Sequence, residues 1–126
     1  MLEIQDHGAV REIRLDRPPA NALNGELVDA LTAALQTAGK EVDAVVISGA
    51  GRMFSAGLDV PELLQLDRSR FAVLWDAFTG LMQIIATLPV PVVFAMQGHA
   101  LAGGALLALF GDYRIMPRGP FKTGLN

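Results

Sequence analysis

The groups in this chain that could do chemistry gather at two glycine-containing turns. The first turn, "FSAGLD", follows one apolar β-branched run, and the second, "LAGGA", follows another. Glycine lets a backbone approach a ligand closely and adopt conformations closed to other residues. Two such turns at adjacent strand ends could each direct one backbone N–H at a single oxygen, forming an oxyanion hole. Close packing of helices on strands explains the same glycines equally well.

The polar side chains near these turns favour structural roles. Ser55 lacks the first glycine of a G-x-S-x-G nucleophile motif, so we interpret it as a small loop residue. His7 is interpreted as a solvated residue of a hairpin turn. His99 opens the second turn, where packing or hydrogen bonding is expected and lining a ligand site is the alternative. For Asp112, a structural ion pair with Arg114 is favoured over a role as catalytic acid.

A nucleotide-binding loop is the other chemistry that glycines suggest, and the sequence argues against it. Gly49 and Gly51 form a G-x-G, but position 54 is Phe, so the dinucleotide fingerprint fails. The phosphate-loop pattern G-x-x-x-x-G-K-[ST] also fails here.

The composition excludes several classes of partner. The 126 residues carry a net charge of −3 without any Lys/Arg cluster, which argues against nucleic acid and against an anionic membrane surface. There is no cysteine, so neither a disulfide nor a thiolate metal site is expected. The first residues show no basic and apolar regions of the kind that predict a secretory signal, so none is expected, and prolines and Gly98 break the apolar runs well short of a membrane span. These features predict a cytoplasmic soluble protein.

The elements that would position the two turns follow from apolar periodicity. Two buried strands each lead through a glycine-containing loop into a helix, and this repeated unit predicts an α/β fold with a mostly parallel sheet. The segments 17–24, 49–60 and 117–126 are expected to be loops. Strands are expected at about 2–6, 9–15, 43–49, 90–98 and 112–116, and helices at about 25–38, from 61, at 69–88 and ending near 110.

Four motifs in order resemble the enoyl-CoA hydratase/isomerase, or crotonase, superfamily. "LDRPPANALN" resembles the family's L-x-R-P-x-x-x-N-A-L segment, and "FSAGLDV" resembles its F-x-A-G-x-D loop. "GHALAGGALLAL" with "GDYRI" resembles its G-x-A-x-G-G-G turn and D-x-R-I strand, and "FKTGLN" resembles the segment leading to its catalytic region.

The resemblance implies a crotonase-like fold of repeated ββα units, a ββα superhelix, of which this chain is the N-terminal portion. Residues 1–126 are expected to form a single core domain, truncated before the C-terminal ββα turn and the trimerisation helices. Members of the family form homotrimers or dimers of trimers.

The resemblance also implies an acyl-CoA thioester as ligand, with no cofactor beyond the coenzyme A of the substrate and no metal. Two backbone N–H groups would polarise the thioester carbonyl, and by position these belong to Leu58 and Gly103. The expected substrate-binding residues are Ala20, Ala22, Ala56, Gly57, Leu58, Asp59 and Gly103.

Two departures from the family pattern bear on the reaction. Hydratases of the family place a glutamate where this chain has Leu106, and leucine cannot transfer a proton. The second family acid would follow Asn126, and in the isomerase branch it alone shuttles a proton between C2 and C4 of a 3-enoyl-CoA. Isomerisation to 2-enoyl-CoA is therefore the expected activity. Alternatives are a catalytically inactive acyl-CoA-binding member, hydration and thioester hydrolysis. Ala102 replaces the first glycine of the family triplet, which is expected to be a mild change.

Overall fold

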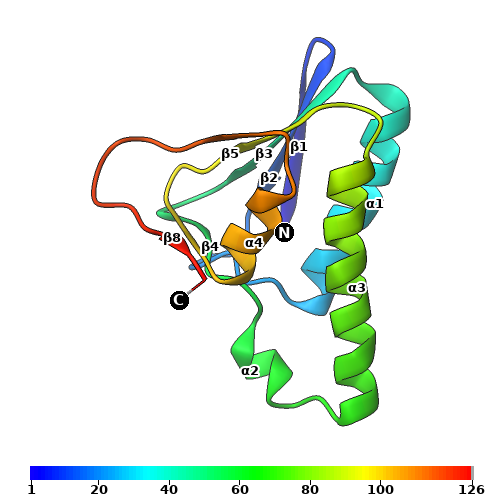
Figure 1. The fold of residues 1–126 in the computed structure, drawn as a ribbon, viewed down its shortest axis with the longest axis vertical. Helices are drawn as coiled ribbons and strands as arrows, with labels where there is room; N and C mark the ends of the chain where they lie inside the picture. The colour runs from blue at the N-terminus through cyan, green and yellow to red at the C-terminus, as the bar shows by residue number, and fades with distance from the viewer. Residues whose placement is uncertain (126) are drawn as a thin grey trace.

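A five-stranded sheet forms the centre of the computed structural model, which describes residues 1–125 (Figure 1). Its strand order is β1-β2-β3-β5-β7, with β1 antiparallel to β2 and the remaining neighbours parallel. The predicted N-terminal hairpin and the mostly parallel sheet are thereby confirmed. The strands are β1 (Leu2–His7), β2 (Val10–Leu15), β3 (Ala44–Gly49), β5 (Val92–Ala95) and β7 (Tyr113–Ile115).

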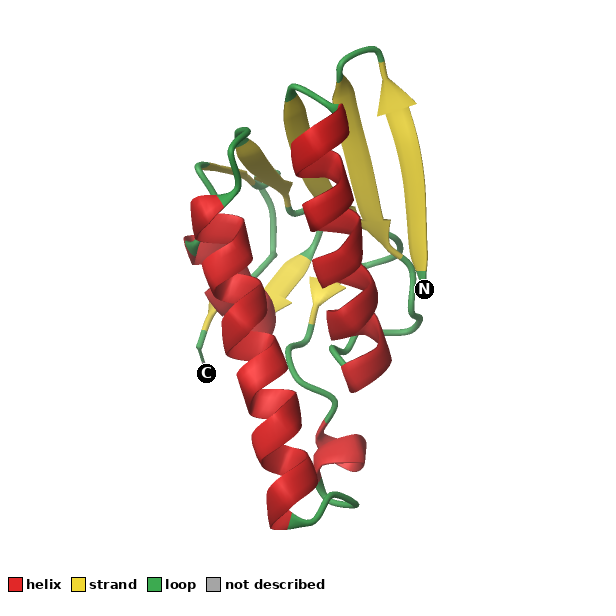
Figure 2. Cartoon of the chain, turned by 90° about the vertical axis from the view of Figure 1, so that its right-hand side faces the viewer, coloured by secondary structure: helices red, strands yellow, loops and turns green. Residues whose placement is uncertain are grey.

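Two long helices lie side by side against one face of this sheet (Figure 2). Asn24 begins α1 as its N-cap, because the side-chain oxygen accepts a hydrogen bond from the Leu27 amide. The helix continues past its expected end at residue 38, and the Val42 amide closes it by donating to the Ala38 carbonyl. The helices are α1 (Gly25–Glu41), α2 (Val60–Leu63), α3 (Arg68–Thr87) and α4 (Gly103–Leu109). Within residues 1–125, none of them combines the length and apolar character needed to cross a bilayer.

A second, three-stranded sheet departs from the elements expected from residue patterns. It contains β4 (Met53–Ser55), β6 (His99–Leu101) and β8 (Thr123–Gly124), paired in parallel. The prediction of loops at 49–60 and 117–126, and of one strand across 90–98, was wrong in these places. Strands of two or three residues beside glycines are too short to show an alternating pattern.

The two sheets together produce the repeated ββα unit that the resemblance implies. One unit runs β3, β4, α2 and α3, and the next runs β5, β6 and α4. In each unit the first strand joins the large sheet and the second joins the small one. The glycine turns lie where the small strands meet the helices, so the repeat brings the two turns together.

The core lies between the large sheet and the helices. Ile13, Ile47 and Phe94 project from three neighbouring strands and are fully buried. Leu31 from α1 and Leu81 from α3 are also inaccessible to solvent. Full burial of such a side chain contributes roughly 2 kcal/mol, so this layer anchors the strands that carry the turns.

Candidate functional site

Asn21 attaches the 16–24 loop to the first glycine turn. Its side chain is 1% exposed, and its amide nitrogen donates to the carbonyls of Ala50, Met53 and Phe54 at 3.0, 2.9 and 3.1 Å. Its backbone adopts a φ of 49°, a left-handed conformation that asparagine tolerates better than most residues. The Asn21 carbonyl also accepts the hydroxyl proton of Ser55 at 2.8 Å. One side chain therefore ties the loop to β4 and to the residues before it.

Ser55 is a buried structural residue of β4 rather than the loop residue expected. Its side chain is fully inaccessible to solvent. Besides donating to Asn21, its hydroxyl oxygen accepts a hydrogen bond from the Gly57 amide at 3.1 Å. With both functions of the hydroxyl occupied, the residue shapes the turn, in agreement with its assignment to a structural role.

The Leu58 amide is left without an acceptor by the way the first turn pairs with the 16–24 loop. Leu23 and Leu58 form an isolated parallel bridge, in which the Leu23 amide donates to Gly57 and the Asp59 amide donates to Leu23. This pattern uses the groups on either side of Leu58 and turns the Leu58 N–H away from Leu23. Within residues 1–125 the Leu58 N–H donates to no other group.

The second turn presents the Gly103 amide in a similar way. Ala102 has φ 48° and ψ −118°, and its own amide donates to the Gly124 carbonyl at 2.8 Å. The Ala102 carbonyl accepts from the Leu106 amide, which fixes the orientation of the peptide between Ala102 and Gly103. Because carbonyl and N–H point in opposite directions in a trans peptide, the Gly103 N–H points away from α4. It meets no acceptor in the described part of the chain.

The two turns touch, and a β-carbon would crowd the contact at three glycine positions. A β-carbon at Gly57, where φ is 95°, would lie 2.7 Å from the Gly103 nitrogen. A β-carbon at Gly103 would lie 3.3 Å from the Leu58 nitrogen, and one at Gly104 would lie 2.5 Å from the Ser55 carbonyl oxygen. Close packing therefore explains these glycines, and the same packing brings the two free amides to one place. The oxyanion role of Leu58 and Gly103 stays a prediction.

A cavity of about 440 Å³ opens beside the first turn, between the 16–24 loop and the start of α2. It brings together five of the predicted binding residues. Gly57 and Gly103 do not line it but meet each other at the turn contact. The lining residues are Arg17, Pro18, Pro19, Ala20, Ala22, Ala56, Leu58, Asp59, Val60 and Pro61.

An ion pair fixes the polar part of this cavity. The Arg17 guanidinium lies 2.8 Å from the Asp59 carboxylate and also donates to the Ala22 carbonyl at 2.9 Å. Asp59 is the N-cap of α2 and accepts a hydrogen bond from the Glu62 amide at 3.1 Å. The Glu62 amide, together with the Arg17 charge, lowers the pKa of the Asp59 carboxyl. Asp59 therefore holds the cavity wall as a carboxylate.

Asp112 has the structural role expected of it, but the predicted partner was wrong. Its carboxylate accepts a hydrogen bond from the Val92 amide at 2.7 Å, which joins the end of α4 to β5. Arg114 instead donates to the carbonyls of Ala108 and Gly111 at 3.0 and 2.9 Å. Backbone groups at the helix-to-strand junction satisfy both side chains because each lies closer to a free backbone partner than to the other.

The remaining residues singled out by the sequence form structural contacts or lie at the surface. His99 accepts a hydrogen bond from the Lys122 amide at 3.0 Å, and its ring meets Phe121 edge-on. His7 is exposed and contacts Glu12 at 3.1 Å. Leu106 is half-buried and packs against the core. The position expected of the family acid after Asn126 lies outside the described residues.

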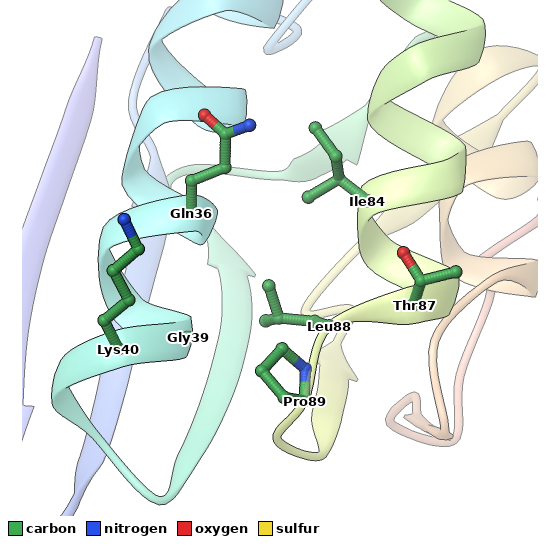
Figure 3. A pocket seen from close by; sticks show the side chains of 7 residues that line it. All are labelled: Gln36, Gly39, Lys40, Ile84, Thr87, Leu88 and Pro89. Carbon is green, nitrogen blue, oxygen red and sulfur yellow. The ribbon is translucent and has the colours of Figure 1, made fainter.

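Another cavity, of about 450 Å³, lies far along α1 and α3 from the turns (Figure 3). Gln36 and Lys40 from α1 stand on one side of it, and Ile84 and Leu88 on the other. It contains none of the residues predicted to bind a ligand. Across residues 1–125, no group of three or more His, Cys, Asp or Glu is placed to hold a metal ion.

The ββα repeat and its paired glycine turns identify the fold class of this chain. The family model for enoyl-CoA hydratase/isomerase matches residues 5–123. The chain belongs to this family.

Known proteins of the family support this assignment. The chain is 41% identical over 101 residues to a probable enoyl-CoA hydratase of Rhodobacter capsulatus, covering 79% of the chain and 39% of that protein. A crystal structure of a putative enoyl-CoA hydratase from Streptomyces coelicolor A3(2) matches with a TM-score of 0.84 and 30% identity, over 91% of this chain and 44% of that one. The crystal structure of an enoyl-CoA hydratase from Thermoplasma volcanium matches with a TM-score of 0.85 and 32% identity, over 91% of this chain and 47% of that one. The chain thus spans less than half the length of these relatives.

Proposed function

We propose that this chain supplies the oxyanion hole and part of the coenzyme A site of an enzyme that isomerises 3-enoyl-CoA to 2-enoyl-CoA. The observation that carries the proposal is the contact between the two turns, which places the free Leu58 and Gly103 amides together. The neighbouring cavity, with Ala20, Ala22 and Ala56 in its wall, is large enough to hold part of a coenzyme A ester.

In the proposed reaction the thioester carbonyl oxygen accepts hydrogen bonds from both amides. A base removes a proton from C2, and the electron pair moves onto that oxygen as an enolate. Return of the proton at C4 shifts the double bond from C3–C4 to C2–C3. Each fixed amide can lower the barrier by roughly 3 kcal/mol, because the negative charge develops on the oxygen that it contacts.

Leu106 favours isomerisation over hydration. It occupies the position where the family's hydratases place an acid, and an apolar side chain there leaves the attacking water without a base. We expect the single proton-transfer group of the isomerase to follow Asn126. The relatives are called probable enoyl-CoA hydratases, so hydration is the competing reaction to measure.

Removal of one amide proton tests the proposal in the protein at its full native length. Ala102→Gly/Gly103→Pro deletes the Gly103 N–H, and glycine before the proline removes the steric conflict with a left-handed residue. Proline suits the first position of a helix, and its β-carbon would lie 3.3 Å from the Leu58 nitrogen, a contact that a small shift of the turn relieves. Circular dichroism checks that the double variant keeps the helical content of Ala102→Gly. Compared with Ala102→Gly alone, we expect kcat for the conversion of 3-enoyl-CoA to fall about 100-fold.

Three outcomes separate the alternatives. Unchanged turnover in the folded double variant contradicts the oxyanion assignment. Turnover of 2-enoyl-CoA to the 3-hydroxy product, with none of 3-enoyl-CoA, indicates a hydratase. Thioester binding without any turnover indicates the non-catalytic binding protein, which Leu106 also favours, and release of free coenzyme A indicates a thioesterase.

A further inference from the structure

A row of three aromatic side chains runs along α3 to the contact between the turns. Phe71, Trp75 and Phe78 lie at helical spacing on one face of α3, which passes beside α4 (Figure 1). The Phe71 and Trp75 rings are 6.2 Å apart and nearly parallel, with an interplanar angle of 14°. The Trp75 and Phe78 rings are 6.0 Å apart. The three rings form a continuous apolar row.

The inner end of this row adjoins the two amides. The ring tip of Phe78 lies 3.3 Å from where a β-carbon of Gly103 would be, and the Leu58 nitrogen lies at the same distance from that point. Phe78 is 1% exposed, whereas Trp75 and Phe71 are 45% and 41% exposed. The row therefore leads from the amide pair outward to solvent, and its outer two rings are accessible.

We propose that this row is the surface on which the acyl group lies, and that it selects acyl groups bearing an aryl ring over saturated chains. The inference rests on the proposed acyl-CoA function, because the thioester oxygen at the amide pair sets where the acyl group begins. Phe78 is buried behind the amide pair at the inner end of the row, and a ring attached further along the acyl group reaches the exposed rings of Trp75 and Phe71. Flat aromatic faces gain more from an aryl ring than from an aliphatic chain of equal size.

The test compares the binding of 3-phenylpropanoyl-CoA and nonanoyl-CoA to the protein at its full native length. The two thioesters have the same number of acyl carbons, and neither has an alkene double bond. Neither can be isomerised or hydrated, and with release of free coenzyme A excluded by a thiol assay of the same samples, calorimetry measures binding alone. We expect the phenyl compound to bind about fivefold tighter. In Trp75→Leu the ratio of the two dissociation constants should fall to near one. Val73→Ala, at a 70% exposed position of α3 outside the row, should retain the ratio.

Fluorescence shows whether the acyl group reaches the row. Trp75 is the one tryptophan of residues 1–126, and the difference between the wild type and Trp75→Phe isolates its signal. We expect the phenyl thioester to change this signal and free coenzyme A to leave it unchanged. Binding of both thioesters without a change in the Trp75 signal overturns the proposal.

The outcomes distinguish this proposal from the function on which it rests. Equal binding of the two thioesters, or tighter binding of nonanoyl-CoA, overturns the aryl preference and leaves an acyl-CoA protein. Failure of both thioesters and of coenzyme A to bind contradicts the proposed function itself. If Trp75→Leu loses its helical circular dichroism, Phe71→Leu should lower the ratio instead, and an unchanged ratio there overturns the proposal.

Discussion

Ala102 holds a backbone conformation that suits glycine better than alanine. Its φ of 48° with a ψ of −118° belongs to a conformation that L-residues rarely adopt and glycine adopts freely. The neighbouring hydrogen bonds from Ala102 to Gly124 and from Leu106 to Ala102 hold it there. The exchange of a glycine for alanine, which the sequence predicts to be mild, therefore places strain on the peptide that carries the Gly103 amide.

Ala102→Gly is expected to stabilise the protein by about 1 kcal/mol. Relief of the left-handed strain outweighs the larger entropy that glycine gives to the unfolded chain. The urea dependence of unfolding measures the change. Ala108→Gly, at a helical position of α4, serves as the opposite control and should be destabilising. A lower stability of Ala102→Gly would show that the β-carbon at Ala102 contributes more by packing than it costs in strain.

At the scale of elements, the long strands and helices could be predicted from the sequence, whereas the small sheet could not. The β-branched run of β3 and the leucine spacing of α1 extend over enough residues to show a period. The strands β4, β6 and β8 have two or three residues and are defined by pairing with each other. Pairing between distant segments leaves no local period in the sequence.

The residues of the candidate site likewise divide into those that the sequence predicts and those that it misses. The motifs place Ala20, Ala56 and Asp59 near one ligand, and the structure brings them to one cavity. Asn21 was missed as a positioning residue because its partners lie about thirty positions away along the chain. Its place as the asparagine of the N-A-L motif was the available signal.

Asn21→Ala is expected to lower the free energy of unfolding by about 3 kcal/mol. The substitution leaves the carbonyls of Ala50, Met53 and Phe54 without their donor, and alanine tolerates a φ of 49° less well than asparagine does. Chemical unfolding measures the loss. Ser55→Ala removes one donor to the same loop and should cost less.

If Asn21 fixes the turn, the two variants should also differ in coenzyme A binding. The Asn21→Ala protein, kept folded at low temperature, should bind the thioester more weakly than the Ser55→Ala protein. Equal stability of the two variants would contradict the role of Asn21 as the main link between the 16–24 loop and β4.

For the molecule as a whole, two carboxylates tie separate elements together. Asp59 caps α2 and pairs with Arg17, and its pKa is lowered first by the Glu62 amide. Glu12 of β2 accepts a hydrogen bond from the Ser48 hydroxyl of β3 and contacts Arg14 of its own strand, and the Ser48 hydrogen bond is the main cause of the lowered pKa of Glu12. These links join the 16–24 loop to α2, and β2 to β3.

Acid is therefore expected to destabilise the protein, and Asp59 should account for part of the loss. A carboxyl whose pKa is lower in the folded state binds fewer protons there than in the unfolded chain, so stability rises with pH across the interval between the two values. The contribution of Asp59 to stability is complete above the pKa of the unfolded chain, about 4, and is lost as the pH falls through the lower pKa of the folded state.

In urea titrations, the Asp59→Asn variant should be less stable than the wild type at pH 7, and the difference in free energy of unfolding should shrink toward pH 3. In the Arg17→Gln background, Asp59→Asn should lower the free energy of unfolding at pH 7 by less than it does in the wild type, because the Arg17 charge favours the Asp59 carboxylate. A difference between wild type and Asp59→Asn that stays constant from pH 7 to pH 3 would show that the side chain stabilises the cavity wall by its shape and neutral hydrogen bonds, without a contribution from its charge.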